Sequence, residues 1–91
     1  MLLNDYRISL TNKILLADSQ EEVQNIVDTA IKALEQNNVN GHIIYRFIEK
    51  TLSEFDSFTP MQKEAQQWSN IKTARILFNR MKQPFKTIVY S

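Results

Sequence analysis

The chain has 91 residues, enough for one domain, and 43% of them are apolar, which suffices for one small core. Eleven basic and ten acidic residues leave a net charge of +1. The absence of Cys excludes a disulfide scaffold, a thiolate metal site and a cysteine nucleophile. One Gly and two Pro are too few for the many turns of an all-β fold.

The N-terminal sequence Met1-Leu2-Leu3-Asn4-Asp5 has no basic segment followed by a continuous apolar one, so no signal peptide is expected. No apolar stretch approaches the roughly 20 residues that a membrane span needs. We therefore expect a cytoplasmic protein without a transmembrane segment.

The first half of the chain predicts two helices. Apolar residues at helical spacing indicate the first over residues 4–17. Ser19 and Glu22 form a capping box that begins the second, over residues 20–36. Its end is indicated by residues 37–41, because Asn and Gly can take the left-handed conformation that closes a helix.

The second half predicts two more helices and a tail. A wide apolar face indicates the third helix over residues 41–55. The Thr-Pro-Met-Gln sequence from Thr59 supplies an N-cap, a proline at the first helical position and a capping box. The fourth helix is therefore predicted over residues 60–83, because Pro84 discourages its continuation. Residues 84–91 form a short, apolar, β-prone tail.

Short breaks between helices make neighbouring helices antiparallel. The predicted fold is all-α, a single-domain antiparallel up-down four-helix bundle with a short C-terminal tail. The residues expected in its core are Leu10, Ile14, Val27, Leu34, Phe47, Ile48, Phe55, Ile71 and Phe78.

Residues that could carry catalysis are scarce. His42 is the only histidine, and it falls at the predicted start of the third helix, where a polar residue of the first turn is expected. The Glu-x-x-His pairs of di-metal bundles are absent, because Val39 stands three residues before His42. No Gly-rich loop precedes a helix, so no phosphate-binding loop is expected. We expect neither an enzyme nor a cofactor or metal site.

The basic residues gather towards the C-terminus. Residues 1–64 hold six basic and ten acidic residues, whereas residues 65–91 hold five basic and none acidic. Lys72, Arg75, Asn79 and Lys82 share one helical face. This basic flank could bind a nucleic acid, an anionic membrane surface or an acidic partner protein. It could instead cover the acidic second and third helices of the same bundle, or be a solvated face whose bases complement the C-terminal helix dipole.

Two further features of the last segment have open interpretations. Trp68 is either a core anchor or a stacking platform at the edge of the basic flank. Ile76 points about 140° away from Ile71 on a regular helix, and so away from the core. Either the tail folds back over Ile76, or Ile76 belongs to an exposed patch that binds a partner or a second copy.

The outline of the chain resembles that of bacteriocin immunity proteins in length, in helix order and in the Phe58-Thr59 lead-in to the last helix. The resemblance implies an antiparallel four-helix bundle with a functional C-terminal segment. Together with the missing catalytic residues, it favours a non-enzymatic protein–protein interaction module, such as an adaptor, antitoxin or immunity-like protein.

The partner would be an unidentified protein or a second copy of the chain, in a homodimer. The alternative is nucleic-acid or anionic-surface binding through the basic flank, which the near-neutral total charge disfavours without excluding it. The candidate binding residues are Trp68, Lys72, Arg75, Ile76, Asn79, Lys82, Phe85, Lys86, Ile88 and Tyr90.

Overall fold

A computed structural model describes residues 2–59 and 63–90 of the chain, with residues 86–90 described by their backbone alone. Its helices are α1 (Leu3–Leu16), α2 (Gln20–Gln36), α3 (Gly41–Ser57) and α4 (Ala65–Tyr90). No strand occurs among the described residues. The predicted all-α four-helix fold is therefore confirmed.

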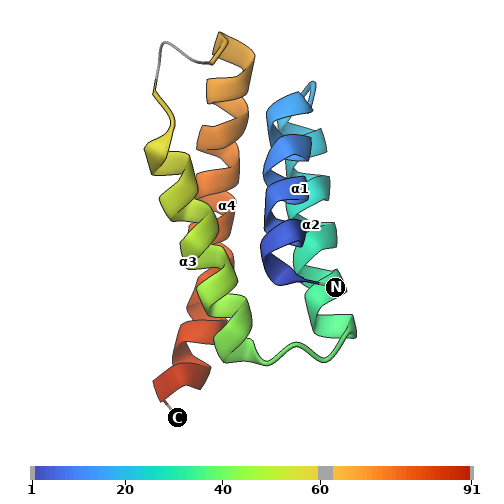
Figure 1. Ribbon diagram of the computed structural model, residues 1–91, viewed down its shortest axis with the longest axis vertical. Coiled ribbons are helices and arrows are strands. Elements are labelled where there is room, and N and C mark those ends of the chain that lie inside the picture. Colours follow the sequence, from blue (N-terminus) through green and yellow to red (C-terminus); the bar gives the residue numbers. More distant parts are fainter. Residues whose placement is uncertain (1, 60–62, 91) are drawn as a thin grey trace.

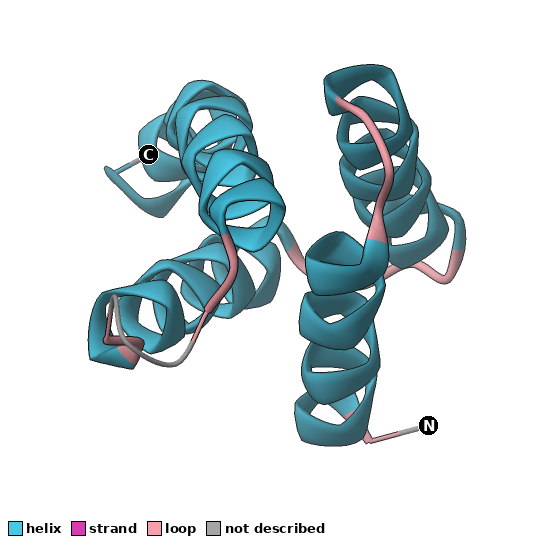
Figure 2. Ribbon diagram, turned by 90° about the horizontal axis from the view of Figure 1, so that it is seen from above, coloured by secondary structure: helices cyan, strands magenta, loops and turns pink. Residues whose placement is uncertain are grey.

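Helices α1 and α2 lie on one side of the bundle and α3 and α4 on the other (Figure 1, Figure 2), and α2 packs more extensively against α4 than against α1. Consecutive helices run in opposite directions along the long axis of the molecule (Figure 1). The bundle measures 41 × 23 × 21 Å. Helix α4 packs against all three other helices, and most extensively against α3.

The caps of the first three helices follow from the sequence. The Ser19 hydroxyl oxygen accepts a bond from the Glu22 N–H at 3.1 Å, as the capping box predicts. The Glu22 carboxylate accepts from the Asp18 N–H, one residue earlier than in an ordinary box. Asn38, with a φ of 59°, takes the left-handed conformation after α2. Gly41 instead opens α3, where the Asn40 side chain accepts from the backbone N–H of His42 at 2.8 Å.

The predicted start of the last helix is wrong. Residues 60–62, which carry most of the predicted capping box, lie outside the described residues. Lys63 and Glu64 are described and are not helical, so the helix begins at Ala65. The Gln67 side chain accepts from the Glu64 backbone N–H at 3.1 Å, and the Trp68 N–H donates to the Glu64 carbonyl. Gln67 thus has the role in the cap of α4 that was predicted for the glutamine of the Thr-Pro-Met-Gln sequence.

The predicted end of the last helix at residue 83 and the predicted β-prone tail are also wrong. Helix α4 continues through Pro84 to Tyr90. Proline has a helical φ but no N–H, so the Arg80 carbonyl loses its helical partner. Both Arg80 and Pro84 are exposed, so water can bond that carbonyl. Phe85, directly after the proline, packs against the core and favours continuation of the helix.

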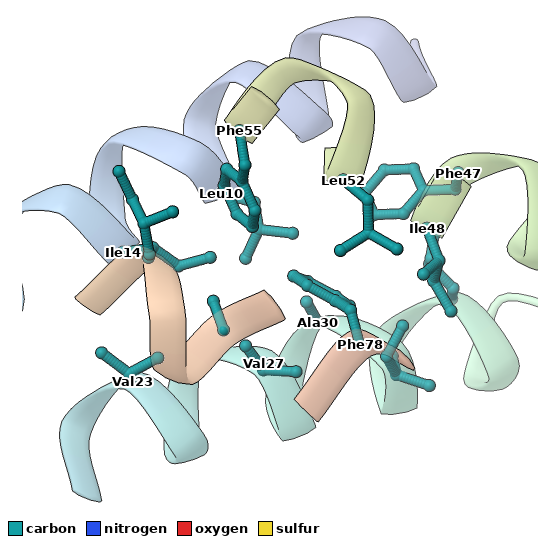
Figure 3. Packing of buried hydrophobic residues seen from close by; sticks show 14 of the residues in the cluster. Leu10, Ile14, Val23, Val27, Ala30, Phe47, Ile48, Leu52, Phe55 and Phe78 are labelled. Atoms are coloured by element: carbon teal, nitrogen blue, oxygen red, sulfur yellow. The ribbon is translucent and has the colours of Figure 1, made fainter. Parts of the chain in front are cut away.

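All nine predicted core residues are buried, none more than 4% exposed. The most extensive packing between two helices joins α3 to α4. There the ring centroids of Phe55 and Phe78 lie 6.3 Å apart. Leu10 and Ile14 of α1 and Val23 and Val27 of α2 point into the same interior (Figure 3). Burial of each large apolar side chain contributes about 1.5–3 kcal/mol, so this core is the main source of stability.

One buried polar side chain joins two helices that are distant in sequence. Asn70 of α4 is 0% exposed, and its Nδ2 donates to the carbonyl oxygen of Ala17, directly after α1, at 2.8 Å. Its Oδ1 accepts from Gln66 Nε2 at 2.9 Å. Because both halves of the amide are bonded, Asn70 fixes the position of α4 against the end of α1 without an unsatisfied polar group.

Candidate functional site

The outward side of α4 holds the most distinctive exposed residues among the predicted binding set. We call this surface the α4 outer face; its residues are exposed and share one side of the helix at helical spacing: Lys72, Ile76, Asn79, Arg80 and Gln83. Ile76 is 47% exposed and lies one helical turn from Lys72 and from Arg80. The face therefore combines an apolar centre with two cations.

The exposure of Ile76 decides between the two interpretations of the C-terminal residues. The backbone of residues 86–90 continues the line of α4 and ends beyond the other helices at that end of the bundle (Figure 1). A tail that folds back over Ile76 is therefore wrong, and Ile76 belongs to an exposed patch.

Two cations of the predicted basic flank bind α3 within the same chain. Arg75 Nη2 lies 2.9 Å from Asp56 Oδ1, and Lys82 Nζ lies 3.1 Å from Glu49 Oε1. The polar hollow between α3 and α4 is lined by these four charged residues together with Leu52 and Asn79. Two cations of the flank thus pair with α3, one of the two acidic helices that the flank was expected to cover, and no described ion pair joins the flank to α2.

Lys72 and Arg80 form no ion pair within the described part of the chain. Asn79 donates from Nδ2 to the Arg75 carbonyl at 2.9 Å. Among the described side chains of α4, the cations open to a ligand are therefore those on either side of Ile76, rather than the whole predicted stripe.

The remaining candidates divide into packing residues and residues beyond the described side chains. Trp68 and Phe85 are half-buried and pack against the core, as expected of anchors. The side chains of Lys86, Ile88 and Tyr90 lie outside the described part, so their roles stay predictions.

A second surface was not predicted from the sequence. A hollow of about 200 Å³ opens between α1 and α3, and we call it the α1–α3 groove; it is lined by Leu3, Asn4, Arg7, Ile43, Arg46, Phe47 and Lys50. The signal in the sequence was the pair Arg46 and Lys50, one helical turn apart and next to the apolar Ile43 and Phe47. No single helix shows the groove, so a pattern along one helix does not reveal it.

A third hollow, of about 230 Å³, lies between α1 and α2, and Tyr6 is one of its lining residues. Burial raises the pKa of the Tyr6 phenol above its ordinary value of 10.0. Its ring lies 5.9 Å from that of Phe47, between centroids.

Residues suited to metal binding do not gather in the described part of the chain, where no cluster of three or more His, Asp or Glu side chains occurs. His42 is exposed at the first turn of α3. Among the described helices, none is both long and apolar enough to cross a membrane.

Comparison of the chain with protein-family models, with curated proteins and with solved structures gives no match. Assignment of a function therefore depends on the chemistry of these surfaces.

Proposed function

We propose that this protein is a non-enzymatic protein–protein interaction module that binds its partner through the α4 outer face and the C-terminal end of α4. The partner is another protein or a second copy of the chain. The observation that carries the proposal is Ile76, a large apolar side chain 47% exposed at the centre of a helix face that none of the described residues covers.

The surroundings of Ile76 suit a protein partner. An apolar anchor with a polar and cationic rim is the usual composition of a protein interface, where the centre excludes water and the rim sets orientation. Lys72 and Arg80 supply such a rim, one helical turn on either side.

The length of α4 adds a second element. Its 26 residues exceed the 17 of α3, its main packing partner, and its last turns continue past the rest of the bundle (Figure 1). These turns offer a partner helical surface that adjoins the α4 outer face.

The ion pairs of α4 favour a protein over a nucleic acid as the partner. A polyanion is bound by a row of free cations, and each phosphate contact needs its own. Arg75 and Lys82 are already paired with Asp56 and Glu49 of α3, so fewer cations of α4 are available to phosphate groups.

Quantitative affinity capture from the cells that produce the protein tests the proposal. The baits are the full chain, Ile76→Ser, a truncation ending at Phe85, and Ile8→Ser as a matched control. Ile8 is 45% exposed on α1, so the two Ser variants remove equally exposed side chains from different faces. The truncation keeps Phe85 because this residue packs against the core.

A specific partner should be recovered by the full chain and by Ile8→Ser, and lost at least tenfold with Ile76→Ser and with the truncation. Light scattering of the same four proteins covers the homodimer, which should dissociate in the same two variants. Equal recovery of partners and the same oligomeric state for all four proteins would refute the proposal.

A further inference from the structure

The α1–α3 groove has an apolar floor. The side chains of Leu3, Ile43 and Phe47 line it from the two helices, and Ile43 is 42% exposed. Helices α1 and α3 pack little against one another, and the groove opens between them. Covering such a solvent-accessible apolar floor with another apolar side chain lowers the free energy.

The rim of the groove is cationic. Arg7, Arg46 and Lys50 line it, and no carboxylate does. Arg7 is turned towards Glu54, with which it forms an ion pair, and it also donates to Asn4. Arg46 and Lys50 are exposed and form no ion pair within the described ranges, so their charges are available to a ligand.

Of the two helices that line the groove, α3 adds to this positive potential at its N-terminus, whereas the dipole of α1 is offset by Asp5 in its first turn. Ile43 lies in the first turn of α3, where the helix dipole is positive. The first turn of α3 contains no acidic residue to offset it. The positive potential of the groove is therefore complementary to an anionic group, and its apolar floor to an apolar group beside that anion.

The volume of the groove limits the occupant. At about 200 Å³ it is smaller than the 300–1,000 Å³ of ordinary small-molecule sites, and it accommodates about one large apolar side chain. A side chain of this kind is presented, with carboxylates at fixed distances from it, by a segment of a protein.

We propose that the α1–α3 groove binds an acidic segment of a partner protein, in which one large apolar side chain fills the groove and neighbouring carboxylates pair with Arg46 and Lys50. This surface shares no residue with the α4 outer face, so either proposal can fail without the other.

The test uses a displayed library of random peptides, selected on the full chain. Three variants are then compared with the wild type: Arg46→Glu with Lys50→Glu, Ile43→Ser, and Lys13→Glu with Lys32→Glu as the control, because these two lysines lie outside both the groove and the α4 outer face. Both double variants lower the net charge by the same amount and replace exposed residues without a described ion pair. Thermal melts confirm that each variant is folded.

Selected peptides should carry Asp or Glu beside Leu, Ile, Phe or Trp. They should bind the control double variant as tightly as the wild type, bind Arg46→Glu/Lys50→Glu at least tenfold more weakly, and bind Ile43→Ser about fivefold more weakly. Competition between a selected peptide and phosphatidylglycerol vesicles distinguishes a protein segment from a lipid surface.

Several results would overturn the proposal: no enrichment of peptides, peptides without acidic residues, or equal binding to the groove double variant. Vesicle binding that depends on Arg46 and Lys50, with no peptide binding, would assign the groove to anionic lipid instead.

Discussion

Asn70 is the single polar residue whose replacement should destabilise the bundle most. In Asn70→Ala, the Ala17 carbonyl loses the partner that bonds it at 2.8 Å, and Ala17 is only 2% exposed. A buried acceptor without a partner costs about 1–3 kcal/mol, and the cavity left by the amide adds about 1 kcal/mol. The expected loss is about 3 kcal/mol, or a fall in Tm of about 15 °C for a domain of this size.

Chemical and thermal unfolding followed by circular dichroism measures this loss. Asn79→Ala is the matched control, because Asn79 lies on the same helix and bonds a backbone carbonyl but is exposed. It should change stability by less than about 0.5 kcal/mol. If Asn70→Ala costs no more than Asn79→Ala, the bond between α4 and the end of α1 does not hold the two together.

Asn70→Asp adds a pH dependence of predictable sign. Burial favours the neutral form, so it should raise the pKa of the new carboxyl above its value in the unfolded chain. The neutral acid can still donate a hydrogen bond to Ala17, so the variant should approach wild-type stability below about pH 4. Its deficit against the wild type should grow as the pH rises from there towards the folded pKa.

Three further predictions follow from local features of the structure. A double-mutant cycle on Lys82→Ala and Glu49→Ala should give a coupling of about 0.5–1 kcal/mol that falls in high salt; a coupling of zero would mean that the contact adds nothing to the packing of α3 and α4. Pro84→Ala should restore a helical hydrogen bond and slow amide exchange in residues 85–90; unchanged exchange would show that the proline does not limit these turns. Burial raises the Tyr6 pKa above 10.0, so the free energy of unfolding should fall as the pH rises from 10.0 through that folded pKa; an equal fall in Tyr6→Phe would refute this assignment.

The helices and the core were predictable because both depend on local spacing. Apolar residues recur at helical spacing in the sequence, for example Leu10 with Ile14 and Phe47 with Phe55. The same residues are buried in the structure, because one face of each helix packs against the core. The cap at Ser19 was equally local, since its hydroxyl bonds a residue three positions on. These contacts need no knowledge of the rest of the fold.

The errors and omissions lie where tertiary contacts decide the outcome. Pro84 stops a helix in isolation, but the next residue, Phe85, has core to pack against. Asn70 gave no sequence signal, because its partner Ala17 lies 53 residues away. The α1–α3 groove likewise combines residues from two helices that a linear pattern cannot bring together. Whether Arg75 and Lys82 bind an external anion or α3 was also undecidable until the two helices were placed side by side.

The central claim, that α4 presents a protein-binding surface, is tested most directly by the amide resonances of the isotope-labelled full chain. Their intensities are compared between dilute buffer and an extract of the cells that produce the protein. The account predicts that signals of the α4 outer face, around Ile76, and of residues 86–90 weaken selectively, while those of the exposed Glu21 and Gln24 on α2 persist. Uniform weakening, or selective weakening on α2 alone, would contradict it.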